Sequence, residues 1–270
     1  MNNDLKISVI ITNYNHGQYI ENAVKSIVNQ TYKNLEIIVI DDGSTDGSAD
    51  IIKKLVTMDD RIRIIILPSN YGKWFALNTA IKEATGNLIA LQDADDECSV
   101  FRIEKQMKCL KQNNSVHNLC GFHHVFNEEQ MEKLVLDDKK RLNLENSFEN
   151  TLFQAQEALE QGYQQKQNFM THKEVAQKVY HGFKTPGINH YFVGHDYEVH
   201  GASTLFYKQL WEYGMKFLPN DLGLMTKIKG EDGDHNLRLT LLLQKTSILK
   251  EPLYFYRRNS GTNQSFRKGL

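Results

Sequence analysis

The sequence predicts an α/β protein with a Rossmann-like, mainly parallel sheet flanked by helices. Short apolar runs alternate with amphipathic segments over the first 114 residues, which is the pattern of a parallel sheet covered by helices. The run at 35–40 is almost entirely apolar, as expected of a strand buried on both faces. With 270 residues and 40% hydrophobic side chains, the chain is long enough for a large core.

Four strand–helix pairs are expected in this first part. The strands are predicted at 5–11, 35–40, 61–67 and 87–92, and the helices at 17–30, 48–58, 72–85 and 100–114. The helix at 17–30 carries its apolar residues at a spacing of 3.6, on one face. Pro68 ends the third strand and Gly86 suits the end of the third helix.

The second half is less regular. A strand pair is expected at 116–126, a strand and a short helix at 201–218, a buried helix after Asp232, and a last strand in LKEPLYFYRR. Residues 127–180 are polar, with weak helical periodicity from about Leu152 to Tyr180. We therefore expect a first half at 1–115 and a second half at 116–270 of one domain, with a variable insertion at 127–200.

Charge and cysteine content narrow the function classes. The net charge of −1 provides no general attraction for nucleic acid. Three cysteines without a CxxC pair, and no secretion signal, indicate reduced thiols and a cytoplasmic protein. Four cations and no carboxylate follow Glu251, which fits a solvated end, a phosphate clamp or a peripheral contact with anionic lipid at the inner membrane face.

The four segments that follow the predicted strands share an unusual composition. They read TNYNHG, DDGSTDG, SNYGKW and DADDECS, and are rich in Asp, Asn, Gly and Ser. Ligands of open α/β sheets bind at the carboxyl ends of the strands. The chemistry of this protein is therefore expected along one edge of the sheet.

Asp41 and Asp42 end the second predicted strand. The stretch partly resembles a calcium loop, but Ser44 stands at its third position and Lys53 where the bidentate Glu belongs. The residues also suit a turn and a helix cap. Alternatively, the two carboxylates accept hydrogen bonds from a base and a ribose.

A second acidic cluster follows the fourth strand, at Asp93, Asp95, Asp96 and Glu97. Two like charges about 4 Å apart repel by about 4 kcal/mol near a protein surface. Residues two apart on a strand share a face, so Asp93 and Asp95 are expected to approach one point. Oxygen ligands suit Mg²⁺ or Mn²⁺, which would relieve the repulsion; the alternative is a solvated acidic turn.

The histidines at 190, 195 and 200 do not indicate a zinc site, because steps of five residues fit neither face of a strand nor of a helix. Together with Tyr191 and Tyr197 they either line an acceptor groove or pack within a loop.

Three stretches resemble the family 2 glycosyltransferases, which have the GT-A fold and use nucleotide-diphospho-sugars. They are ISVIITNYNHGQYIENAVKSIVNQTYKNLEIIVIDDGSTDGS, NYGKWFALNTAIKEATGNLIALQDADD and the later GED. The resemblance covers 5–112 closely and 201–258 loosely, and does not extend over 127–200. It does not specify a sugar.

The resemblance implies roles for individual residues. The expected donor-binding residues are Thr12, Tyr14, Asp41, Asp42, Lys73, Asn78, Asp93 and Asp95, with Arg257 or Arg258 on the phosphates. Asp95 and Asp96, and by extension Asp93, would hold Mn²⁺ or Mg²⁺ on the diphosphate. Asp232 would be the general base, with Glu231 beside it. Asn259 stands where the family usually has a His, so no metal contact is carried over to it.

The expected reaction is metal-dependent, inverting transfer of a sugar, with UDP as the default nucleotide, to a hydroxyl of a glycan, lipid-linked or other acceptor in bacterial-type surface glycan synthesis. One alternative is a nucleotidyltransferase, although TNYNHG lacks a Gly-rich phosphate loop with Lys or Arg. Another is a Mg²⁺-binding receiver-like module, although the first strand is not followed by acids.

Overall fold

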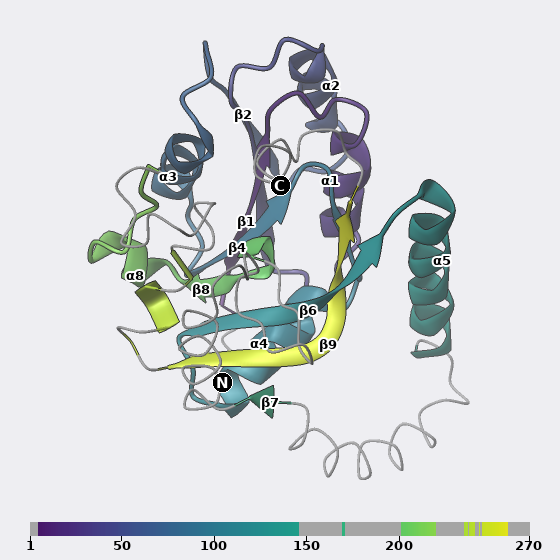
Figure 1. Cartoon of the computed structure of the whole chain (residues 1–270), viewed down its shortest axis with the longest axis vertical. Coiled ribbons are helices and arrows are strands. Elements are labelled where there is room, and N and C mark those ends of the chain that lie inside the picture. The colour runs from purple at the N-terminus through teal and green to yellow at the C-terminus, as the bar shows by residue number, and fades with distance from the viewer. Residues whose placement is uncertain are drawn as a thin grey trace, which may run out of the picture.

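A nine-stranded sheet organises the part of the chain that the computed structural model describes, namely residues 5–145, 169–170, 201–219, 235–236, 238–240, 243 and 245–258. The strand order is β3-β2-β1-β4-β8-β6-β9-β5, and β7 pairs with β9 (Figure 1). The sheet is mixed and mainly parallel, and the predicted class is confirmed.

The strands are β1 (Ile7–Asn13), β2 (Leu35–Asp41), β3 (Ile62–Ile66), β4 (Leu88–Asp93), β5 (Glu97–Cys98), β6 (His117–Val125), β7 (Phe169–Met170), β8 (Leu205–Tyr207) and β9 (Thr246–Arg257). The helices are α1 (Ile20–Val28), α2 (Ser48–Leu55), α3 (Lys73–Glu83), α4 (Arg102–Gln112), α5 (Glu128–Glu145) and α8 (Lys208–Glu212), with a 3₁₀ turn η1 (Gly201–Ser203).

The first half contains the four predicted strand–helix pairs. β1 pairs in parallel with both β2 and β4, and β2 pairs in parallel with β3. Alternate residues of β1 enter two cores: Val9 packs on the side of α1, α2 and α4, and Ile10 packs on the side of α3. Parallel pairing brings the carboxyl ends of all four strands to one edge.

The second half continues the same sheet through β8, which is antiparallel to both β4 and β6. The predicted strand pair at 116–126 is wrong, because one long strand, β6, runs through it beside β9. The pairing register of β6 shifts at Cys120 and Gly121. A Cβ atom on Gly121 would lie 2.8 Å from the carbonyl oxygen of Lys250, so this close approach requires glycine.

The helix α5 lies in the segment predicted as a variable insertion, before the weakly periodic stretch that we expected to be helical. A reciprocal cap starts it: the Gln130 N–H donates to Asn127 Oδ1 at 2.9 Å, and the Phe126 N–H donates to Gln130 Oε1 at 2.8 Å. Asn127-x-x-Gln130 was a signal that our prediction missed. The periodic stretch from Leu152 to Tyr180 lies almost entirely outside the described residues.

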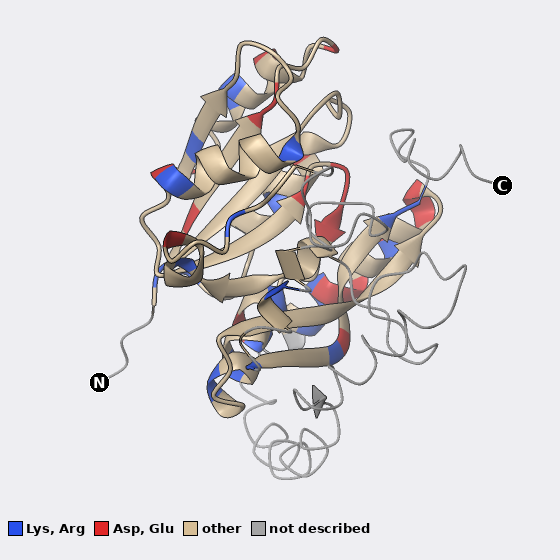
Figure 2. Ribbon diagram, turned by 60° about the vertical axis from the view of Figure 1, so that its left-hand side comes forward, with Lys and Arg blue, Asp and Glu red and all other residues tan. Residues whose placement is uncertain are grey.

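Charged positions of both signs are spread over the described ribbon, in agreement with the near-zero net charge (Figure 2). All three cysteines are free thiols and buried. In the part of the chain that the structure describes, no helix combines the length and the apolar character needed to cross a membrane.

Candidate active site

The carboxyl ends of β3, β2, β1 and β4 bring the predicted polar segments together. Asp41 is fully buried there and accepts hydrogen bonds through Oδ2 from Asn13 Nδ2 and Ser44 Oγ, both at 2.6 Å. The Ser44 N–H donates to the second oxygen, Oδ1, at 2.9 Å. Asp41 therefore connects the end of β1 to the loop that follows β2.

Asp42 braces the loop that follows β3. Its two carboxylate oxygens accept the backbone N–H groups of Tyr71 and Gly72, each at 2.9 Å. Burial raises the pKa of the Asp42 carboxyl, the two N–H groups oppose that rise, and the charge of Asp41 adds to it. This carboxylate thus joins β2 to the loop leading into α3.

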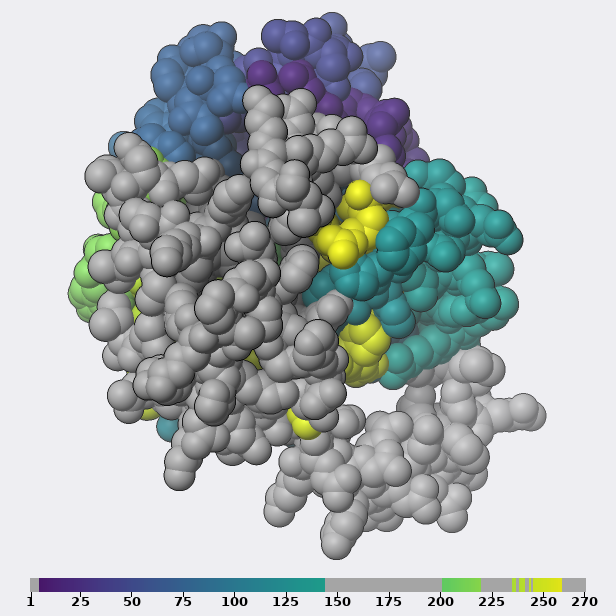
Figure 3. All heavy atoms as spheres, viewed as in Figure 1, coloured from purple at the N-terminus to yellow at the C-terminus, as the bar shows by residue number. Residues whose placement is uncertain are grey.

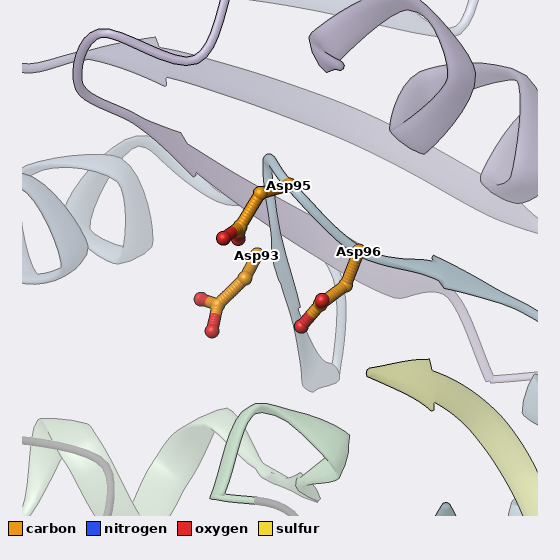
Figure 4. Close-up of side chains that lie close together, drawn as sticks. All are labelled: Asp93, Asp95 and Asp96. Atoms are coloured by element: carbon orange, nitrogen blue, oxygen red, sulfur yellow. The ribbon is translucent and has the colours of Figure 1, made fainter. Parts of the chain in front are cut away.

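Three carboxylates gather at the end of β4, where Asp93, Asp95 and Asp96 each place one oxygen within 4.8 Å of the other two (Figure 4). The convergence confirms the predicted cluster, but not the reason that we gave for it. β4 ends at Asp93, so Asp95 is not on the strand. A turn closed by the Asp96 N–H on the Asp93 carbonyl oxygen, at 3.3 Å, brings the acids together instead.

Asp96 is the buried member of the cluster, with 1% of its surface exposed. Its Oδ1 accepts the Arg257 N–H at 2.7 Å, whereas Oδ2 is buried without a hydrogen-bond partner in the described structure. Burial raises the pKa of the Asp96 carboxyl well above its usual range, and the charges of Asp95 and Asp93 raise it further. The Arg257 N–H and the Tyr254 hydroxyl oppose this rise.

The donor set fits a divalent cation. A cation here would give Asp96 Oδ2 the partner that it lacks and would offset the mutual repulsion of three carboxylates. Oxygen-only ligands suit Mg²⁺ or Mn²⁺. Lys73 already neutralises part of the charge, since its Nζ lies 2.7 Å from Asp93 Oδ1. Lys73 and the three acids are therefore brought together as predicted.

Thr12 lies near the end of β1, and Tyr14 directly follows that strand. Thr12 is the register partner of Ile40 in β2 and of Asp93 in β4, so it stands between the two acidic segments. Tyr14 follows β1 and is 41% exposed. Both positions agree with the predicted location at the carboxyl edge.

Arg257 is not the unpaired cation that the tail composition suggested. Its guanidinium forms ion pairs with Glu97, at 3.4 Å, and with Glu128, and only 5% of its side chain is exposed. The Arg257 Nε also donates to the Asp95 carbonyl oxygen at 2.9 Å, and the guanidinium lies 4.5 Å from the centre of the Tyr19 ring.

Our expectation that no acid competes for Arg257 was therefore wrong, because residues distant in sequence supply the carboxylates. Arg258 is half-buried, with its guanidinium 5.5 Å from the centre of the Tyr256 ring. In Figure 3 the C-terminal strand, in yellow, reaches the surface beside the teal segment of β6 and α5.

Asn78 lies on α3, and its side chain forms hydrogen bonds with neighbouring parts of the fold. Its Nδ2 donates to the Phe217 carbonyl oxygen at 2.8 Å, and its Oδ1 accepts from Trp211 Nε1 at 2.8 Å and from the Phe217 N–H at 3.2 Å. These bonds fasten α3 to α8 and the segment after it. They do not connect Asn78 to the acidic cluster.

Glu231 and Asp232 lie outside the described residues, and so do His190, His195, Tyr191, Tyr197 and His200. The predicted buried helix after Asp232 is seen at residues 235–236, 238–240 and 243, where His235 and Leu239 are fully buried. The described residues of this segment therefore agree with the predicted buried helix.

Two supporting residues were missed by the sequence reasoning. Gln92 Nε2 donates to the carbonyl oxygens of Asp93, at 3.2 Å, and Asp96, at 3.0 Å. The Tyr254 hydroxyl accepts the Asp93 N–H at 3.1 Å. A polar Gln92 at the end of an otherwise apolar strand was the available signal, whereas nothing local marks Tyr254, which is 161 residues away from Asp93.

Comparison with known proteins agrees with this fold and identifies the family. The family model "Glycosyl transferase family 2" matches residues 8–180. The chain is 36% identical over 134 residues to an uncharacterized glycosyltransferase of Haemophilus influenzae, covering 50% of this chain and 54% of that protein. It is 34% identical over 116 residues to the Bacillus subtilis glycosyltransferase TuaG, whose name refers to teichuronic acid biosynthesis, covering 43% and 46% respectively.

Solved structures show the same fold. Residues 1–349 of S. aureus TarS, crystallised with UDP, superpose with a TM-score of 0.60 at 17% identity, covering 94% of this chain and 61% of that one. The Pyrobaculum calidifontis mannosyltransferase PcManGT, in complex with GDP-Man and Mn²⁺, gives 0.56 at 19% identity, covering 94% and 57%.

The mixed sheet and its superposition on these structures define the fold as the GT-A type. The chain belongs to glycosyl transferase family 2. It spans about half the length of the curated relatives it matches. The family match extends to residue 180, further than the resemblance read from motifs, which stopped near 112 and resumed at 201.

Proposed function

We propose that this chain transfers a sugar from a nucleoside diphosphate to an acceptor hydroxyl with the help of a divalent cation. The observation that carries the proposal is the cluster of Asp93, Asp95 and Asp96, with a buried carboxylate oxygen that lacks a partner. A nucleoside diphosphate is the anionic ligand that such a cation would bridge to the protein. UDP is the nucleotide of the TarS complex and GDP-Man that of PcManGT, so both bases are candidates.

Different residues of this chain are proposed to hold the cation, the phosphates and the nucleoside. Asp95 and Asp96 would hold Mn²⁺ or Mg²⁺, with Asp93 completing the set. When bound, the ion supplies Lewis-acid stabilisation of the departing diphosphate. Lys73, already within 2.7 Å of Asp93, is placed to contact a phosphate oxygen when one arrives. The nucleoside would lie along Thr12, Tyr14 and the loops that Asp41 and Asp42 hold in place.

Asp232 is proposed to take the proton from the acceptor hydroxyl while that oxygen attacks the anomeric carbon. The bond between the anomeric carbon and the diphosphate breaks on the opposite side, so the configuration inverts. Glu231 is its neighbour in the sequence and the next candidate. The acceptor is proposed to be a glycan or a lipid-linked sugar of a surface polysaccharide, and the support for this is the name of TuaG, which refers to teichuronic acid biosynthesis.

The experiment is a panel of UDP- and GDP-sugars incubated with the protein and Mn²⁺, with release of the free nucleotide as the readout. One nucleotide sugar is expected to be hydrolysed faster than the others, even without acceptor, and chelation of the metal should stop the reaction. Release that is equal for all donors, or unchanged by chelation, would contradict the proposal.

A further inference from the structure

Arg102, the first residue of α4, is a cation buried without a counter-ion. None of its surface is exposed, and no carboxylate lies within ion-pair distance of it in the described structure. Its acceptors are neutral: Gln92 Oε1 at 2.9 Å, the Leu91 carbonyl oxygen at 2.8 Å, Gln106 Oε1 at 3.0 Å and the Ala202 carbonyl oxygen at 3.3 Å. Burying an unpaired cation costs several kcal/mol, which calls for a function.

The hydrogen bonds of Arg102 determine which way the Gln92 amide faces. A guanidinium carries only donors, so the amide atom that contacts it must be the oxygen, Oε1. The amide nitrogen is then turned toward the acidic site. There Nε2 donates to the Asp93 and Asp96 carbonyl oxygens, which are the two ends of the turn that carries the carboxylates.

A second contact runs through Tyr254. The Arg102 guanidinium lies 5.1 Å from the centre of the Tyr254 ring, and the hydroxyl of that ring accepts the Asp93 N–H at 3.1 Å. The ring is fully buried, so its position depends on what packs against it. Both connections lead from one buried cation to the backbone of Asp93.

We propose that Arg102 is a positioning residue of the acidic site: it orients the Gln92 amide, which bonds to both ends of the Asp93–Asp96 turn and sets the spacing of the carboxylates. This inference rests on the proposed function, because the spacing of the three carboxylates matters for binding a divalent cation. Residues behind a metal's direct ligands commonly change its affinity by 10- to 100-fold.

The test is a double-mutant cycle of Arg102→Met and Gln92→Met, read out by calorimetric titration with Mn²⁺ alone. Each single variant is expected to weaken Mn²⁺ binding by about tenfold or more. Because Arg102 contacts the site through Gln92 as well as through Tyr254, the double variant should be little weaker than Arg102→Met alone. Fold changes that multiply, or Mn²⁺ affinities within about twofold of wild type, would overturn the proposal.

Two further variants separate positioning from general stability. Arg102→Lys keeps the charge and loses the planar fork, so it should also weaken Mn²⁺ binding, and it carries the test if Arg102→Met does not fold. His117→Asn is the matched control, because His117 is equally buried and bonds instead to Thr204, Thr246 and Asn236. It should lower the unfolding midpoint while leaving Mn²⁺ affinity within about twofold.

A metal-free measurement keeps this inference distinct from the proposed function. In ¹⁵N spectra of the protein without metal, the Gln92 side-chain NH₂ should exchange slowly with water in wild type and His117→Asn, and quickly in Arg102→Lys. If wild type binds no Mn²⁺ but shows this pattern, the metal assignment fails and the positioning role stands. If exchange is unchanged in Arg102→Lys, the positioning role is wrong whatever the metal result.

Discussion

Replacing Asp96 by Asn should stabilise the metal-free protein. Two unit charges 4.8 Å apart, the upper limit between the carboxylate oxygens here, repel by about 0.9 kcal/mol in water and about 3.5 kcal/mol at an effective dielectric constant of about 20. Asn keeps an oxygen for the Arg257 N–H and places an NH₂ donor near Asp93 and Asp95. We expect the free energy of unfolding at pH 8 to rise by about 2 kcal/mol, below the Coulomb value because Lys73 already neutralises part of the charge of Asp93.

The stability of the protein should also depend on pH through Asp96. The raised pKa of Asp96 means that the native state keeps a proton that the unfolded state releases above a pH of about 4. The unfolding free energy that this group contributes therefore falls as the pH rises from there through the native pKa. Asp96→Asn should remove this fall, so the two proteins should differ more at pH 8 than at pH 5.

Urea unfolding at pH 5 and pH 8 in the presence of a chelator provides the measurement. The control is Asp50→Asn, which removes a carboxylate that is 79% exposed and should change stability by less than about 0.5 kcal/mol. An Asp96→Asn protein that is less stable than wild type at pH 8, with the same dependence on pH, would refute the reasoning.

Four further substitutions test other parts of the molecule. Asp232→Asn should lower turnover by roughly 10²–10⁴ if general base catalysis is lost, while the calorimetric affinity for nucleotide with Mn²⁺ stays near wild type; near-normal transfer would show that another residue is the base. Arg257→Ala leaves the buried Glu97 uncompensated and should cost about 3 kcal/mol in urea unfolding, whereas Arg258→Ala should cost less than about 1 kcal/mol; equal losses would contradict the assigned ion pairs. Gly43→Ala should destabilise by more than about 2 kcal/mol, because its φ is +70° and a Cβ would meet the Ser69 carbonyl carbon at 2.3 Å; an unchanged unfolding midpoint would show that the two loops separate freely.

The first half of the fold could be predicted because its signals are local. Apolar runs at 35–40 and 88–91 and the helical spacing at 20–28 each specify an element within a dozen residues. Parallel pairing then places the polar segments at one edge without further information. The second half depends on pairings that the sequence does not mark. One example is β8, which forms short antiparallel pairings with both β4 and β6.

In the candidate site too, local patterns could be predicted and long-range contacts could not. The acids after β4 and β2 were visible as patterns, and the structure brings Asp93, Asp95, Asp96 and Lys73 together. The partners of Arg257 could not be predicted, because Glu97 and Glu128 reach it from β5 and from α5. Contacts across more than 100 residues leave no trace in spacing or composition.

The central claim is that the acidic turn after β4 binds a nucleoside diphosphate through a divalent cation. Its most direct test is calorimetric titration of UDP and of GDP into wild type and Asp96→Asn, each with and without Mn²⁺. In wild type, Mn²⁺ should tighten the binding of at least one nucleotide by about tenfold or more, and Asp96→Asn should remove most of that gain. Wild-type affinities that are the same with and without Mn²⁺ for both nucleotides would contradict the account.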